Sequence, residues 1–92
     1  MTLNDFVEEG IRRAQAVGYH PTAFMGMWYP DRSPKVLENL VSTSDPKTGY
    51  KRMVREGLKD WTLEAAVVAY PDHFSKKAVE YAKFRLTGAL DE

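Results

Sequence analysis

The sequence predicts an all-α fold, a compact single-domain bundle of five or six short helices that takes in residues 1–92. Apolar residues recur at helical spacing in successive segments, and residues that cap or end helices stand between those segments. A chain of 92 residues forms one domain with a thin core. The composition, 43% hydrophobic and 28% charged, is typical of a globular protein rather than a disordered one.

The first helix is expected to follow Thr2, an N-cap residue, with Asp5 as the carboxylate of a capping box. It runs for about 15 residues, as judged from its apolar periodicity. The apolar residues that define this periodicity are Leu3, Phe6, Val7, Ile11, Ala14 and Val17. Gly18 suits the left-handed residue that closes a helix, and Pro21 suits the first position of a second, short helix that ends near Trp28.

Two further helices are expected in the middle of the chain. A cap at Ser33 and a first helical residue at Pro34 begin the third helix. Its apolar residues are Val36, Leu37, Leu40 and Val41. The fourth helix should span about residues 46–56 and end at Gly57, as the turn signals indicate. Its inward residues are Tyr50, Met53 and Val54.

The last two helices follow threonine and serine caps. Thr62 caps a fifth helix over residues 63–69, which is apolar on nearly all sides and therefore expected in the middle of the core. Its end also suits a buried strand, but the sequence offers no second strand to pair with it. Ser75 caps the final helix, which extends to about residue 86 or 90. Its inner stripe is predicted to be Val79, Ala82 and Leu86.

Two stretches of sequence carry a recognisable pattern. Residues 18–27 read Gly-Tyr-His-Pro-Thr-Ala-Phe-Met-Gly-Met, and residues 57–65 read Gly-Leu-Lys-Asp-Trp-Thr-Leu-Glu-Ala. They resemble an uncharacterised family of short all-helical bacterial proteins and C-terminal domains. That family has a Gly-Tyr-x-Pro-x-x-Phe-x-x-Met opening and a Gly-x-x-Asp-x-Ser/Thr-x-Glu-Ala motif. The resemblance continues at residues 49–53 and 82–86 and so covers nearly the whole chain. It implies the fold and no known activity.

One position departs from this pattern. The family usually has Arg-Leu after the second glycine, whereas this chain has Leu58 and Lys59. The motif residues themselves are mostly glycines, helix caps and core groups. They therefore bear on packing rather than on chemistry.

Candidate catalytic and metal-binding residues are few. The chain has no cysteine and none of the common nucleotide-, zinc- or calcium-binding motifs. Its histidines, His20 and His73, are far apart and are interpreted as making local hydrogen bonds. The polar cluster of Asp60, Thr62 and Glu64 is interpreted as a helix start, with Thr62 as cap and Glu64 near the positive end of the helix dipole. We therefore expect no enzyme, no metal and no cofactor.

Charge is polarised along the chain although the formal net charge is zero. Basic residues gather in residues 47–59 and 76–85, and two such helices lying side by side would form a phosphate-binding patch. The alternative function is therefore a nucleic-acid-binding accessory module. Its candidate residues are Lys51, Arg52, Arg55, Lys76, Lys77 and Lys83. The favoured interpretation of these runs is a solvated helix exterior.

Large apolar residues outside the expected inner faces suggest an interaction surface. These residues are Met25, Trp28, Tyr29, Tyr81 and Phe84. Aromatic residues and methionine are enriched in interface cores, although a small domain could also bury all five. The expected function is a small non-enzymatic protein-binding domain, an accessory subunit or a stoichiometric inhibitor encoded by a phage or mobile element. Its partner is another protein or a second copy in a homodimer.

The expected location is the cytoplasm, without membrane contact. The longest fully apolar run, residues 65–70, is far shorter than a membrane span. The first residues lack the basic start and apolar stretch of a signal peptide.

Overall fold

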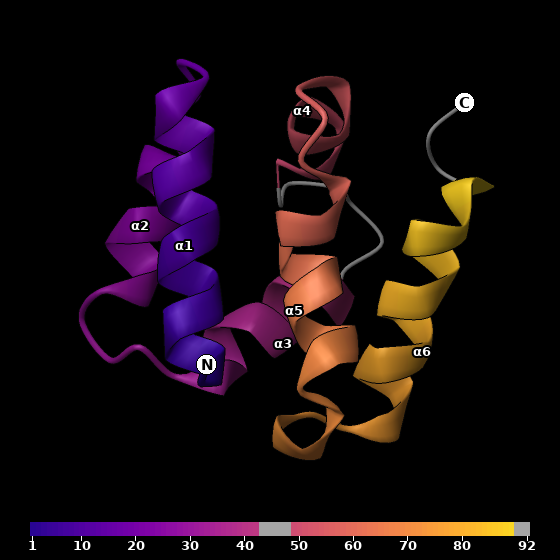
Figure 1. Cartoon of the computed structure of the whole chain (residues 1–92). Coiled ribbons are helices and arrows are strands. Elements are labelled where there is room, and N and C mark those ends of the chain that lie inside the picture. The colour runs from indigo at the N-terminus through magenta and orange to yellow at the C-terminus, as the bar shows by residue number, and fades with distance from the viewer. Residues whose placement is uncertain (43–48, 90–92) are drawn as a thin grey trace.

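The computed structural model describes residues 1–42 and 49–89, with the side chains of residues 88 and 89 left out (Figure 1). Helices account for all regular structure in this part of the chain, which confirms the all-α prediction. The α-helices are α1 (Leu3–Ala16), α2 (Thr22–Trp28), α3 (Pro34–Ser42), α4 (Tyr50–Arg55), α5 (Leu63–Ala69) and α6 (Lys76–Phe84). Two 3₁₀ turns, η1 (Lys59–Trp61) and η2 (Pro71–His73), and a π-helical turn, η3 (Arg85–Ala89), complete the fold.

The short helix α5 occupies the centre of the fold, as its composition predicts. It packs against α1 on one side, α6 on the other and α3 behind (Figure 1). Ala66 and Val67 are fully buried there. The helix is not enclosed on every side, however, because Val68 is half-buried and Ala69 is exposed. One flank of α5 therefore reaches the surface between α1 and α6.

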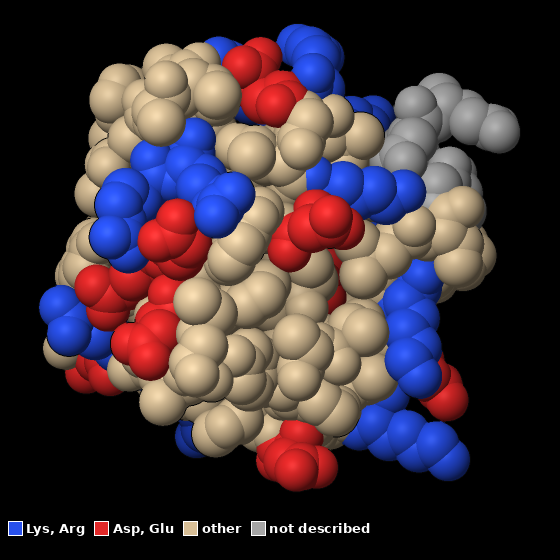
Figure 2. Space-filling view, in the orientation of Figure 1, with Lys and Arg blue, Asp and Glu red and all other residues tan. Residues whose placement is uncertain are grey.

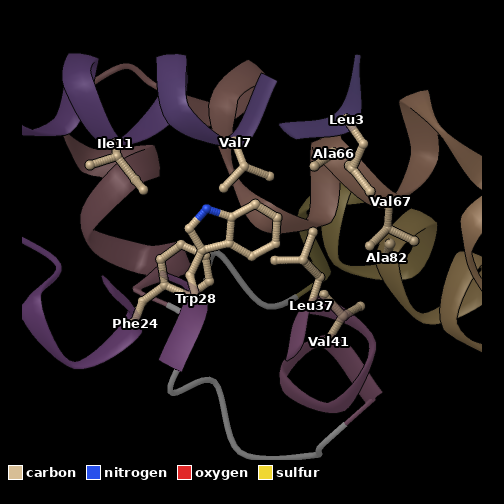
Figure 3. Close-up of a cluster of buried hydrophobic side chains, with 10 residues drawn as sticks. All are labelled: Leu3, Val7, Ile11, Phe24, Trp28, Leu37, Val41, Ala66, Val67 and Ala82. Atoms are coloured by element: carbon tan, nitrogen blue, oxygen red, sulfur yellow. The ribbon is translucent and has the colours of Figure 1, made fainter. Parts of the chain in front are cut away.

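The hydrophobic core is organised around Trp28, the last residue of α2. Its indole lies between the α1 side chains Val7 and Ile11 and the α3 side chain Leu37 (Figure 3). The Phe24 ring lies 6.0 Å from the indole, centroid to centroid, at an interplanar angle of 21°. Trp28 is 0% exposed. Its assignment to a partner-binding surface is therefore wrong, because α2 turns this face toward α1 and α3.

Three of the predicted helix caps form as expected. The Thr2 hydroxyl accepts a hydrogen bond from the Asp5 backbone N–H (3.2 Å), and the Asp5 carboxylate accepts one from the Thr2 backbone N–H (3.0 Å). The hydrogen bond that the Asp5 carboxylate accepts from the Thr2 backbone holds the pKa of Asp5 below its ordinary value, and the nearby Thr2 hydroxyl lowers this pKa further. Thr62 and Ser75 accept backbone hydrogen bonds in the same manner at the starts of α5 and α6.

Helix boundaries differ from the predictions at two places. Pro21 lies one residue before α2, as its N-cap, instead of in its first position. The fourth helix begins at Tyr50, because the preceding Gly49 has φ +75° and a left-handed residue cannot continue a helix. The part of the predicted helix at residues 46–48 lies outside the described residues.

The inner face of α6 also differs from the predicted one. Ala78, Ala82 and Arg85 are the buried residues of this segment, whereas Val79 and Leu86 are half-buried. The small side chains of Ala78 and Ala82 let α6 pack closely on its neighbours. The third buried residue, Arg85, carries a charge. Within the described part of the chain, no helix is both long enough and apolar enough to span a bilayer.

Candidate interaction surface

A buried ion pair joins the start of α5 to the end of α6. The Arg85 guanidinium Nη1 donates to the Glu64 carboxylate Oε2 at 2.7 Å, and the two residues are 3% and 0% exposed. The hydroxyl of Tyr50, the first residue of α4, donates to the Arg85 backbone carbonyl at 2.8 Å. The start of α4, the start of α5 and the end of α6 therefore meet at one polar centre.

The sequence interpretation missed this centre. It assigned Glu64 to the helix dipole and counted Arg85 in the second basic run. One signal could have placed Arg85 on the inner face of the last helix, because it follows Ala78 and Ala82 at helical spacing. No such signal names Glu64 as its partner. Both charged groups are closed off from solvent, so the pair ties the start of α5 to the end of α6.

The other chemical candidates are dispersed. His20, His73 and Asp60 are all exposed. Across residues 1–42 and 49–89, no three histidine or acidic side chains gather closely enough to hold a metal ion. Thr62 is buried as the cap of α5 and also donates its hydroxyl proton to the Lys59 carbonyl at 2.9 Å. Thr62 thus acts as the cap of α5.

An apolar pocket lies between α1, α2 and η1. Its lining includes Val7, Ile11, Phe24, Met53 and Trp61. The volume is about 30 Å³, which is roughly the share of one water molecule in the liquid. A pocket of this size holds no organic substrate or cofactor.

Several aromatic side chains form a row over α1, η1 and the end of α5. The Phe6 ring stacks on Trp61 at 4.8 Å and meets Tyr70 edge-on at 5.8 Å. The Arg13 guanidinium also lies over the Trp61 ring, 4.3 Å from its centroid. The Tyr70 hydroxyl donates to the Met1 carbonyl at 2.9 Å. Each ring of this row already has an intramolecular partner, so the row fastens α1 to the rest of the domain.

The predicted surface at the end of α2 is much reduced in the structure. Trp28 is in the core, and Met25 is half-buried with its sulfur 3.8 Å from the Gln15 side-chain amide. Tyr29 is exposed but lies beneath the Arg32 guanidinium, 5.4 Å from the ring centroid. Met27, which the sequence interpretation did not select, is 45% exposed. Only a small and divided apolar surface remains here.

The outward face of α6 is the most exposed aromatic surface of the described chain. Phe84 is 56% exposed and Tyr81 is 40% exposed. With Lys77 and Glu80 they line one shallow depression, and the four positions share a helix face beside the one that carries Ala78 and Ala82. We call Lys77, Glu80, Tyr81 and Phe84 the α6 stripe. Because α6 is an edge helix (Figure 1), this stripe faces solvent.

The basic residues do not gather into one patch. In Figure 1, α4 lies at the top of the molecule, whereas the first turn of α6, with Lys76 and Lys77, lies at the bottom. Arg85 is buried, and the Nε of Arg52 is 3.6 Å from the Glu56 carboxylate.

Figure 2 likewise shows Lys and Arg interspersed with Asp and Glu. Of the candidate phosphate-binding residues, Lys51, Arg52 and Arg55 lie on α4 and Lys76, Lys77 and Lys83 on α6. The first turn of α6, with Lys76 and Lys77, therefore lies away from α4, whereas the end of α6 meets α4 at the Tyr50–Arg85 hydrogen bond.

Comparison with known proteins adds no relative: no family model, no curated protein and no solved structure matches this chain.

Proposed function

We propose that this chain is a small non-enzymatic protein-binding domain, an accessory subunit or stoichiometric inhibitor, that contacts its partner through the α6 stripe. The observation that carries the proposal is the exposure of two neighbouring aromatic rings, Tyr81 and Phe84, on one face of an edge helix. Aromatic anchors of this kind supply much of the binding energy of protein interfaces.

The exposed aromatic area is large enough to matter energetically. The exposed fractions of Phe84 and Tyr81 correspond to roughly 200 Å² of aromatic surface, and burying it is worth about 4–5 kcal/mol before the cost of association. Neither ring stacks on another ring in the described chain, in contrast to Phe6 and Trp61. Among the described surfaces, the α6 stripe is therefore the one whose burial against a partner would release the most free energy.

The non-enzymatic part of the proposal has separate support. The Glu64–Arg85 pair is enclosed, and the apolar pocket beside Trp61 has a volume of about 30 Å³. Both features serve packing. The exposed aromatic rings of the α6 stripe, by contrast, are suited to contact with another macromolecule.

The proposal is tested by affinity capture from a native lysate of cells that produce the protein. The bait is wild type, the double variant Tyr81→Ser/Phe84→Ser, or the control Met27→Ser. Met27 is a matched control because it is 45% exposed and lies on α2, away from the stripe. The lysate is cross-linked before capture, so that weak contacts are also retained. We expect wild type and the control to retain one protein, or a second copy of this chain, at similar yield. The double variant should retain at least tenfold less of it.

Folding of the variants is checked by far-UV circular dichroism before capture. The stripe residues are exposed, so the double variant should keep the helical spectrum and melt within a few degrees of wild type. Capture of the same proteins by all three baits, at similar yield, would contradict the proposal.

A further inference from the structure

We infer that the occupant of the α6 stripe is the α6 stripe of a second copy of this chain, packed antiparallel about a two-fold axis. This inference rests on the proposed function, because it names the partner of the same surface. The observation behind it is the pattern of the stripe. A cation, an anion and two aromatic rings lie on one helix face, Lys77 and Glu80 toward its start and Tyr81 and Phe84 toward its end.

Such a pattern is complementary to itself when it is inverted. A two-fold axis that passes between residues 80 and 81 places Lys77 of one copy opposite Phe84 of the second copy. The same axis places Glu80 opposite Tyr81. At a rise of about 1.5 Å per residue, Lys77 lies about 6 Å along the helix axis from Glu80 of the second copy, within reach of a lysine side chain.

Each contact in this arrangement is favourable and occurs twice, as two-fold symmetry requires. The Lys77 ammonium lies over the Phe84 ring of the second copy and attracts its Glu80 carboxylate. The Tyr81 hydroxyl donates to that carboxylate. The two Tyr81 rings meet near the axis and exclude water from the centre.

The charges of the stripe are available for these contacts. Among the described residues, the ion pairs of this chain involve neither Lys77 nor Glu80. The Lys77 ammonium lies 6.0 Å from the Tyr81 ring of its own helix, so it is already directed over the stripe. A net charge of zero also means that two copies approach without long-range repulsion.

Other exposed faces are less suited to self-association. The face of α4 carries Lys51 and Arg55, which would meet like charges in a second copy. The aromatic row over α1 already makes intramolecular stacks. A single helix face is smaller than the roughly 800 Å² per partner of a standard interface. We therefore expect a weak dimer, with a dissociation constant of about 0.1–1 mM.

Sedimentation of the purified full chain between about 10 μM and 1 mM tests the inference. Wild type and the control Met27→Ser should shift from monomer to dimer over this range. Phe84→Ser should raise the dissociation constant at least tenfold. A dimer unaffected by Phe84→Ser would overturn the inference, because the contact would then lie elsewhere.

A charge-reversal pair tests the antiparallel register itself. Lys77→Glu and Glu80→Lys should each raise the dissociation constant about tenfold, because each brings like charges together across the axis. The double variant Lys77→Glu/Glu80→Lys restores opposite charges. It should return to within about fivefold of wild type. A double variant weaker than either single variant would overturn the register.

The outcomes separate this inference from the proposed function. Self-association is overturned if the chain stays monomeric at 1 mM. The proposed function remains intact if the stripe substitutions still abolish capture of a protein from the lysate. In that case a different protein occupies the stripe. A monomer that also captures no stripe-dependent partner overturns both.

Discussion

Replacing Arg85 by methionine removes the guanidinium that lies 2.7 Å from the Glu64 carboxylate in a site that is 0–3% exposed. Breaking a buried ion pair by removing one partner costs about 3–5 kcal/mol, because the remaining charge stays out of water. A domain of this size has a total stability of about 5–14 kcal/mol. The Arg85→Met variant should therefore lose about a fifth or more of its stability and melt roughly 12–40 °C lower.

Urea unfolding followed by far-UV circular dichroism measures this loss, and the chain offers a matched control. Arg12 forms an ion pair with Glu9 at 2.8 Å, nearly the same distance, but its side chain is 70% exposed. The same substitution, Arg12→Met, should cost about 0.5 kcal/mol or less, since solvent screens exposed pairs. The two sites differ in burial, and also in that Glu9 keeps a second partner, Arg13, at 2.9 Å. Both differences predict a smaller loss for Arg12→Met.

Replacing both buried partners provides the third arm of the experiment. Glu64→Leu/Arg85→Met exchanges the ion pair for apolar side chains and should lie within about 1 kcal/mol of wild type, because the cost of desolvating two charges disappears. The reasoning would be refuted by equal losses for Arg85→Met and Arg12→Met. It would also be refuted by a double variant less stable than Arg85→Met alone.

Three further substitutions test other parts of the fold. Trp28→Ala should cost about 3–5 kcal/mol in urea unfolding, because the indole is fully buried, and a loss below 1 kcal/mol would contradict its place in the core. Gly49→Ala should be more destabilising than Gly57→Ala. Both residues are left-handed, which costs alanine about 1–2 kcal/mol, but only at residue 49 does the new methyl group overlap the Tyr19 hydroxyl. Equal losses at the two glycines would count against this account. Asp5→Asn should lower the thermal midpoint at neutral pH and have no effect in strong acid. The folded-state pKa of Asp5 is depressed, so its stabilisation is present above about pH 4 and is lost as the pH falls through the folded pKa. A difference from wild type that persists unchanged at pH 2 would argue against the capping box.

Local signals in the sequence located most helix ends correctly. The hydroxyl groups of Thr2, Thr62 and Ser75 each bond to a backbone N–H three residues later, so the interaction is contained within one turn. Gly18 and Gly57 end α1 and α4 with φ +85° and +78°. Such signals can be read from sequence because every atom involved lies within a few residues.

Exposure was harder to predict than helix position. Periodicity correctly placed Tyr81 and Phe84 off the inner face of the last helix, and both are exposed. The same reasoning failed for Trp28, since the end of α2 is covered by α1 and α3, which are distant in sequence. A helical pattern tells which residues share a face. It does not tell how many neighbouring helices will cover that face.

Charge pairing between helices was also beyond the sequence. Arg85 belonged by position to a basic run, and only the packing of α6 against α5 turns it inward to meet Glu64 at 2.7 Å. Similarly, the Glu38 carboxylate on α3 accepts the backbone N–H of Ser75 at 2.7 Å and adds a second cap to α6. Neither contact has a local signature.

By itself, the sequence determined the helical class, the caps and stops, and the central position of α5, since turn chemistry and hydrophobic periodicity act over a few residues. Only the tertiary structure decided which side chains are enclosed. It placed Trp28 in the core, paired Arg85 with Glu64, kept the first turn of α6 away from α4 and left the α6 stripe exposed. Burial is set by what packs against a residue from elsewhere in the chain, and that information is not local.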